Sequence, residues 1–85
     1  MNTVWSRDNC GWCDKAKELL DNYGFEYEVK NVYENKEEFR REFPDAKTVP
    51  QVIFNGEKVG GYADLYQVFE EQNIFFNGGR HGTSF

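Results

Sequence analysis

Two cysteines, Cys10 and Cys13, separate two stretches of the chain that differ in hydrophobic periodicity. Before them, residues 2–6 form a short extended run with two apolar residues, which predicts a first strand. After them, apolar residues recur at helical spacings from residue 12 to residue 23, as on one face of an α-helix. The cysteine pair therefore stands at a strand–loop–helix junction, with Cys10 at the N-terminus of the predicted helix and Cys13 one turn inside it.

The same rules predict five further elements. They are a strand over residues 25–30, a helix over 35–43, strands over 51–54 and 57–59, and a helix from 62 to 72. Pro44 ends the second helix, because a proline disfavours helical geometry in the residue before it. Asn55-Gly56 predicts a tight hairpin, since both residues tolerate positive φ. The order β-α-β-α-β-β-α predicts an α/β domain with a mixed sheet flanked by helices.

Size and charge restrict the class of protein. With 85 residues the chain has room for one domain, and its 18% aromatic content can supply much of a small core. Ten Lys and Arg against fifteen Asp and Glu give a net charge of -5. This charge disfavours nucleic-acid binding, which depends on attraction to phosphates. The sequence has no signal-peptide pattern and no membrane-spanning apolar run, so we expect a cytoplasmic protein.

The end of the chain differs from the rest. Residues 77–85 contain three glycines and no periodicity, so we assign residues 1–76 to the folded domain and 77–85 to a flexible tail. The single histidine, His81, lies in this tail. We expect it to be solvated rather than to act as a metal ligand or a base.

The position of Cys10 predicts redox chemistry. The positive end of a helix stabilises a thiolate and can lower a cysteine pKa from about 8.5 to roughly 3.5–7.5. Arg7 can add a positive charge to this effect. We expect Cys10 to be the more exposed thiol and the nucleophile that attacks a disulfide. Cys13 then resolves the mixed disulfide, unless a free thiol does so instead.

The cysteine pair alone leaves two other interpretations open. A Cys-x-x-Cys motif can form half of a zinc site, which needs two further ligands. Here those would have to come from carboxylates and His81, because the chain has no other cysteine or histidine. The two cysteines can also be buried residues without any chemistry.

Thr48-Val49-Pro50 predicts a peptide-binding edge. A proline before a strand cannot donate to the ladder, and a tight turn can hold the preceding bond cis. The amide and carbonyl of Val49 would then be available to an extended peptide. The alternative is an ordinary proline at a strand edge.

Gly60-Gly61, followed by Tyr62-Ala63-Asp64, predicts a sharp strand-to-helix turn. The N–H groups at the helix start could bind a carboxylate, and Asp64 could bind an ammonium group. The γ-glutamyl end of glutathione carries both groups. The alternative is that Asp64 only stabilises the first turn of its own helix.

Three segments together resemble the glutaredoxin family in order and spacing, and the resemblance covers about residues 2–74. They are Arg7-Asp8-Asn9-Cys10-Gly11-Trp12-Cys13, Thr48-Val49-Pro50-Gln51-Val52-Ile53-Phe54 and Val59-Gly60-Gly61-Tyr62-Ala63-Asp64-Leu65. The compact length is similar to that of bacterial or bacteriophage glutaredoxins with two active-site cysteines. The resemblance implies a thioredoxin-like fold with a four-stranded mixed sheet.

The resemblance also implies a glutathione site. Val49, before a cis Pro50, would bind the cysteinyl part of glutathione, and Ala63 and Asp64 its γ-glutamyl end. Arg40 or Arg41 could reach the glycine carboxylate. The residues implied to bind glutathione are Arg7, Trp12, Thr48, Val49, Pro50, Gly61, Tyr62, Ala63 and Asp64.

The implied activity is glutathione-dependent reduction of protein disulfides and glutathione mixed disulfides by a monomer without a metal. Ribonucleotide reductase is one expected electron acceptor. The chain departs from the family between the cysteines, where Gly11-Trp12 replaces the usual Pro-Tyr. Small residues at this point resemble those of relatives that bridge a [2Fe-2S] cluster between two subunits. Such a carrier is the alternative function.

Overall fold

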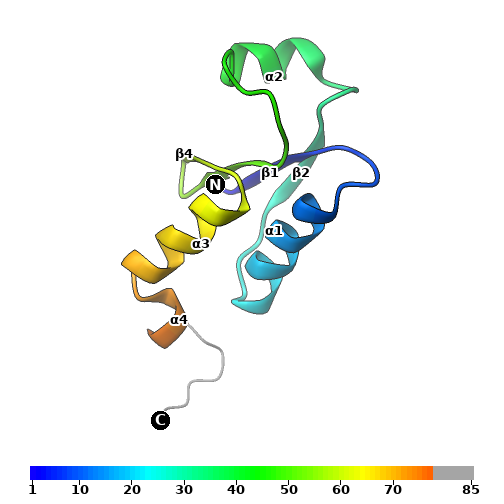
Figure 1. Cartoon of the computed structure of the whole chain (residues 1–85). Coiled ribbons are helices and arrows are strands. Elements are labelled where there is room, and N and C mark those ends of the chain that lie inside the picture. The colour runs from blue at the N-terminus through cyan, green and yellow to red at the C-terminus, as the bar shows by residue number, and fades with distance from the viewer. Residues whose placement is uncertain (78–85) are drawn as a thin grey trace.

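The computed structural model describes residues 1–77 as alternating strands and helices (Figure 1). The elements are β1 (Thr3–Ser6), α1 (Gly11–Asn22), β2 (Glu28–Asn31), α2 (Lys36–Glu42), β3 (Gln51–Phe54), β4 (Glu57–Gly60), α3 (Tyr62–Glu71) and α4 (Ile74–Asn77). The predicted order β-α-β-α-β-β-α is confirmed, and one short helix follows it.

The four strands form one mixed sheet in the order β2-β1-β3-β4. β1 is parallel to β2 and antiparallel to β3, and β3 is antiparallel to β4. Asn55 and Gly56, at the turn between β3 and β4, have φ values of 54° and 82°. The predicted hairpin is therefore confirmed, and a left-handed conformation at both turn residues explains why Asn-Gly stands there.

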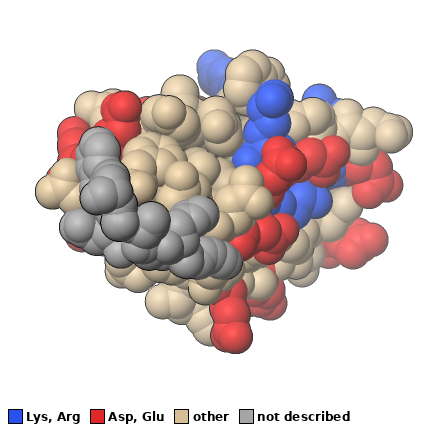
Figure 2. Space-filling model, turned by 90° about the horizontal axis from the view of Figure 1, so that it is seen from below, with Lys and Arg blue, Asp and Glu red and all other residues tan. Residues whose placement is uncertain are grey.

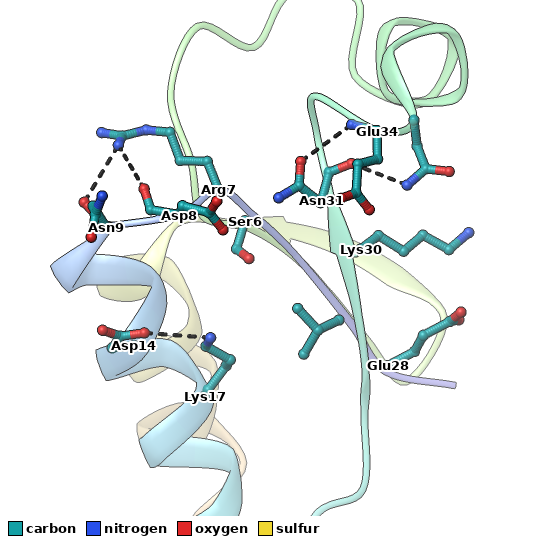
Figure 3. A pocket seen from close by; sticks show the side chains of 12 residues that line it. Ser6, Arg7, Asp8, Asn9, Asp14, Lys17, Glu28, Lys30, Asn31 and Glu34 are labelled. Atoms are coloured by element: carbon teal, nitrogen blue, oxygen red, sulfur yellow. Dashed lines mark hydrogen bonds and ion pairs between the residues drawn. The ribbon is translucent and has the colours of Figure 1, made fainter.

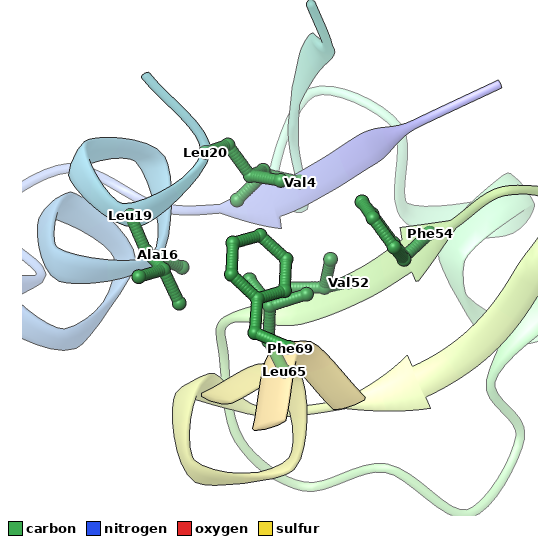
Figure 4. Close-up of a cluster of buried hydrophobic side chains, with 8 residues drawn as sticks. All are labelled: Val4, Ala16, Leu19, Leu20, Val52, Phe54, Leu65 and Phe69. Carbon is green, nitrogen blue, oxygen red and sulfur yellow. The ribbon is translucent and has the colours of Figure 1, made fainter. Parts of the chain in front are cut away.

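Helices cover both faces of the sheet. On one face, α1 and α3 lie side by side and close a core with apolar residues of β1 and β3 (Figure 4). The buried core residues are Val4, Ala16, Leu19, Leu20, Val52, Phe54, Leu65 and Phe69. Trp5 points to the opposite face because side chains alternate along a strand. There it meets Phe39 of α2, with ring centroids 5.2 Å apart.

The second strand differs from the prediction. It begins at Glu28 rather than at residue 25, and Phe25 and Tyr27 pack against the core from the loop before it. Val29, expected on an apolar face, is 47% exposed. The reason is its position: β2 is an edge strand that pairs with β1 alone, so fewer elements cover it.

The end of the described chain also differs from the prediction. Ile74–Asn77 forms α4, so Asn77, expected to start the tail, is instead the last residue of a helix. The packing of Phe75 explains why this helical turn forms. Its ring centroid lies 4.8 Å from that of Tyr66 and 5.2 Å from that of Tyr23. The rest of the predicted tail, with His81, lies outside the described residues.

Charged side chains are distributed unevenly on the surface seen from below. Figure 2 shows Asp and Glu spread across this view, whereas Lys and Arg gather in one part of it. Among the helices of residues 1–77, none has the length and apolar character needed to cross a membrane.

Candidate active site

The cysteine pair occupies the start of α1, as predicted. Cys10 is the N-cap residue, with φ -120° and ψ 103°, and its carbonyl accepts the first helical hydrogen bond from Asp14 N–H at 3.1 Å. Asn9, just before it, has a φ of 57°. This left-handed residue, a conformation that asparagine tolerates, turns the chain from the end of β1 into the helix.

Cys10 and Cys13 are joined by a disulfide, with their Cα atoms 5.3 Å apart. Cys10 is 7% exposed and Cys13 is 1% exposed, which confirms the predicted order of exposure. The Cys13 N–H group donates to Cys10 Sγ at 3.2 Å. In the reduced protein the same N–H group would stabilise a thiolate on Cys10, because a donor directed at sulfur favours its charged form.

Arg7 is exposed and lies beside the loop that leads to Cys10. Its guanidinium group donates to the carbonyl oxygens of Asp8 and Asn9 at 3.3 and 3.4 Å (Figure 3). These bonds hold a positive charge close to the start of α1. A polar cavity of about 490 Å³ lies between this loop, α1 and β2. Figure 3 shows the side chains that line it. Neither cysteine lines that cavity, so we do not assign the redox site to it.

The second predicted segment, Thr48-Val49-Pro50, lies beside the disulfide. The bond between Val49 and Pro50 is cis, as expected. Pro50 is buried, and the Val49 carbonyl oxygen lies 3.9 Å from Cys10 Sγ. A backbone edge therefore stands directly beside the more exposed sulfur.

A cavity of about 310 Å³ joins this backbone edge to Arg7. Thr48 and Val49 line it together with Arg7, so residues from two separate segments of the chain meet here. Lys47 also lines it, although this residue was not among the predicted site residues. The sequence contained an indication of this role, because Lys47 is a cation directly before Thr48 of the predicted peptide-binding edge. The cavity therefore carries two positive charges, those of Arg7 and Lys47.

Two arginines do not join this cavity. Arg40 and Arg41 lie on α2 and are exposed, whereas the part of α2 that lines the cavity is Phe39. The suggestion that one of these arginines meets the glycine carboxylate of glutathione therefore has no support from this geometry.

The third predicted segment, Gly60 to Asp64, forms the turn into α3 and its first residues. The Gly61 N–H group donates to the Asp64 carboxylate at 3.1 Å, so this side chain stabilises the first turn of its own helix. Gly60 has a φ of 113°, and a Cβ atom there would collide with the Asp64 carboxylate. A Cβ at Gly61 would lie 3.7 Å from the Pro50 carbonyl oxygen. The turn thus needs glycine at position 60, and it places the α3 N-terminus beside the proline loop.

Trp12 and Tyr62 connect the first and third segments. Their ring centroids are 5.7 Å apart, although Trp12 is 59% exposed. Ala63 is exposed next to Tyr62. Within residues 1–77, no group of three or more His, Cys, Asp or Glu side chains is arranged to hold a metal ion.

A disulfide at a helix N-terminus, beside a cis-proline loop and on this sheet topology, defines the redox site of a thioredoxin-like thiol-disulfide oxidoreductase. Comparison with known proteins identifies the family. The glutaredoxin family model matches residues 2–59. Glutaredoxin 1 of Rickettsia prowazekii (strain Madrid E) is 36% identical over 75 residues, which cover 84% of this chain and 79% of that protein. The chain belongs to the glutaredoxin family.

Solved structures agree with this assignment. Reduced Escherichia coli glutaredoxin matches with a TM-score of 0.69 and 26% identity, covering 85% of this chain and 95% of that chain. A buckwheat glutaredoxin-glutathione complex matches with a TM-score of 0.71 and 22% identity, covering 87% of this chain and 72% of that chain. At the latter identity the likeness shows the fold alone.

Proposed function

We propose that the protein uses glutathione to reduce protein disulfides and glutathione mixed disulfides, with ribonucleotide reductase among its electron acceptors. The observation that carries the proposal is the position of Cys10 Sγ, between the Cys13 N–H group at 3.2 Å and the Val49 carbonyl at 3.9 Å. One neighbour stabilises a thiolate, and the other belongs to a backbone edge that can pair with a substrate chain.

The reaction follows from the two cysteines. In the reduced protein, the Cys10 thiolate attacks one sulfur of a substrate disulfide, and the other sulfur leaves as a thiolate that takes up a proton. The Cys13 thiolate then attacks Cys10 Sγ, which releases the second substrate thiol and forms the Cys10–Cys13 disulfide. Two glutathione molecules restore the dithiol: the first forms a mixed disulfide, and the second releases it as oxidised glutathione. Each half-reaction consists of two exchange steps and transfers one electron pair.

The charges beside the site support glutathione as the reductant. Glutathione has two carboxylates and one ammonium group, and Arg7 and Lys47 line the cavity next to Val49. Its γ-glutamyl end would meet the N-terminus of α3 and Asp64. Asp64 already accepts one hydrogen bond from Gly61, but a carboxylate has enough lone pairs to accept an ammonium group as well. The glutathione complex of the buckwheat relative is consistent with this proposal.

The proposal also places the protein in the cytoplasm, where the glutathione pool keeps most thiols reduced. It acts there as a monomer, because one chain contains both cysteines and all the proposed binding residues.

The test is an assay with glutathione, its reductase and a small glutathione mixed disulfide. We expect Cys10→Ser to abolish turnover, because it removes the attacking sulfur. Cys13→Ser, the matched control, separates two routes: retained activity shows that Cys10 alone suffices with glutathione, and lost activity shows that both thiols are required. Turnover by the Cys10→Ser protein would refute the assigned nucleophile.

The cluster-carrier alternative depends on Gly11. A Cβ atom at this position would meet no atom within 4 Å, so the fold leaves open space at the start of α1. Anaerobic purification distinguishes the two functions. A coloured dimer containing iron and sulfide would favour the carrier, and a colourless monomer would count against it.

A further inference from the structure

Aromatic rings form a continuous strip from the disulfide along α3. Trp12 meets Tyr62 at 5.7 Å, and Tyr62 meets Tyr66 at 6.1 Å between ring centroids. We call these three residues the aromatic strip. Trp12 and Tyr66 are 59% and 41% exposed. Contiguous exposed apolar surface marks interaction sites on soluble proteins, and the proposed glutathione contacts make no use of Tyr66.

The exposed surface of α3 next to the strip is acidic. The helix contains Asp64, Glu70 and Glu71, all of them exposed, and no Lys or Arg. The cations Arg7 and Lys47, in contrast, line the cavity next to Val49. The charge therefore differs between this cavity and the C-terminal turn of α3, where Glu70 and Glu71 lie. Such an asymmetry sorts partners by charge, because like charges placed together at an interface disfavour binding.

We propose that the aromatic strip and the acidic surface of α3 dock an extended, basic segment of the protein substrate. This inference rests on the proposed function, since the docked segment carries the disulfide that Cys10 attacks. Apolar residues beside the substrate cysteine pack on the aromatic strip. Lys or Arg residues further along the segment pair with Glu70 and Glu71.

The dimensions fit such a segment. An α-helix rises about 1.5 Å per residue, so Tyr66 lies roughly 6 Å and Glu70 roughly 12 Å along the axis from Tyr62. An extended chain covers about 3.3 Å per residue. A cation about four or five residues from the substrate cysteine therefore reaches Glu70 or Glu71. Glutathione is a tripeptide whose γ-glutamyl end would reach only the N-terminus of α3, so it is too short to use the far end of this helix.

The test uses two ten-residue peptides, each with a glutathionylated cysteine followed by leucine. One peptide has lysines four and five residues after the cysteine, and the other has glutamates there. We expect wild-type protein to reduce the lysine peptide with a kcat/KM about three- to tenfold higher. Glu70→Lys/Glu71→Lys should remove this preference, and Tyr66→Ala should lower kcat/KM about threefold for both peptides. Neither variant should change turnover of a small glutathione mixed disulfide.

Two controls keep the outcomes distinct. Glu28→Lys/Glu57→Lys makes the same change in net charge on the edge strands, so it should leave the peptide preference intact. Tyr66→Phe keeps the ring and should retain wild-type kcat/KM, which shows that the ring rather than the hydroxyl group is required. Unchanged turnover of the small disulfide by Tyr66→Ala shows that the lost packing against Phe75 has not disturbed the redox site. The docking proposal is overturned if wild-type protein treats both peptides alike. It is also overturned if the edge-strand control lowers the preference as much as the α3 variant does.

Binding tests the docking surface without any reaction. Peptides with serine in place of cysteine are titrated into the oxidised protein by calorimetry, and the lysine peptide should bind about three- to tenfold more tightly. If wild-type protein turns over no disulfide but keeps this binding preference, the proposed function fails and the docking surface stands. Equal binding of both peptides, with normal turnover of the small disulfide, refutes the docking surface alone.

Discussion

The two faces of the sheet are packed very differently. The face under α1 and α3 contains eight buried apolar residues, including Leu65 and Phe69 at 0% exposure. The face under α2 depends on one fully buried ring, Trp5, which meets the half-buried Phe39. No residue of α2 itself is buried, and in Figure 1 this helix stands apart from the rest of the fold.

The difference in packing between the two faces corresponds to two parts of the redox site. The disulfide and the Gly60-Gly61 turn lie at the N-termini of α1 and α3, the two helices that close the densely packed face. The 310 Å³ cavity, in contrast, has Phe39 of α2 as part of its wall. The disulfide therefore lies on a helix of the densely packed face. One wall of the cation-lined cavity, in contrast, belongs to α2, which covers the sparsely packed face.

Loss of a central ring on the dense face should have the largest effect. Phe69→Ala removes a fully buried side chain whose ring contacts Phe25, Phe54, Tyr23 and Phe75. We expect a loss of about 3–5 kcal/mol in the free energy of unfolding, close to the whole stability of so small a domain. Urea denaturation followed by far-UV circular dichroism measures it. A loss below about 1.5 kcal/mol would show that the two faces do not differ as described.

Loss of the ring on the sparse face should cost less. Phe39→Ala removes a half-buried side chain that packs on Trp5 and Phe43. We expect a loss of about 1.5–2.5 kcal/mol, because part of this ring is already in water. The reduction rate of a small mixed disulfide should change through KM more than through kcat, since Phe39 lines the cavity and does not touch sulfur. A loss as large as that of Phe69→Ala would remove the contrast between the faces.

Alkaline pH should produce the smallest losses of folding stability, with one contributing residue on each face of the sheet. The hydrogen bond to Glu38 raises the pKa of Lys30, which also lies over the Trp5 ring. On the other face, burial and a hydrogen bond to Asp21 raise the pKa of Tyr27. In both cases the folded state holds the proton more tightly. Their stabilisation is therefore complete below the ordinary values of 10.5 and 10.0 and is lost as the pH rises through the raised values.

The measurement is the unfolding free energy at several pH values between 9 and about 12. Lys30→Met and Tyr27→Phe should each reduce the decline above pH 10, and the double variant should reduce it further. An unchanged decline in both single variants would show that other groups control alkaline unfolding.

Local patterns were sufficient to predict much of this molecule. The order of the first seven elements and the Asn55-Gly56 hairpin were predicted correctly from these patterns, and the family resemblance implied the cis bond before Pro50. These features depend on side-chain periodicity, turn chemistry and motif spacing, which a few neighbouring residues express.

Other features required the three-dimensional arrangement. The exposure of Val29 follows from the edge position of β2, and α4 exists because Phe75 packs against Tyr23 and Tyr66. The sequence left two roles open for Asp64, and the structure shows that its carboxylate caps the first turn of α3. Lys47 at the cation-lined cavity was not foreseen.

The sequence by itself determined that Cys10 and Cys13 stand at a helix start and that two further segments could accompany them. Only the tertiary structure decided what lies near the sulfur atoms: cations in the cavity lined by Thr48, and the aromatic strip with its acidic neighbours along α3. The physical reason is that periodicity and turns arise from contacts within a few residues. A surface shared by α1 and α3, in contrast, arises from packing between segments about 50 residues apart, which no local pattern records.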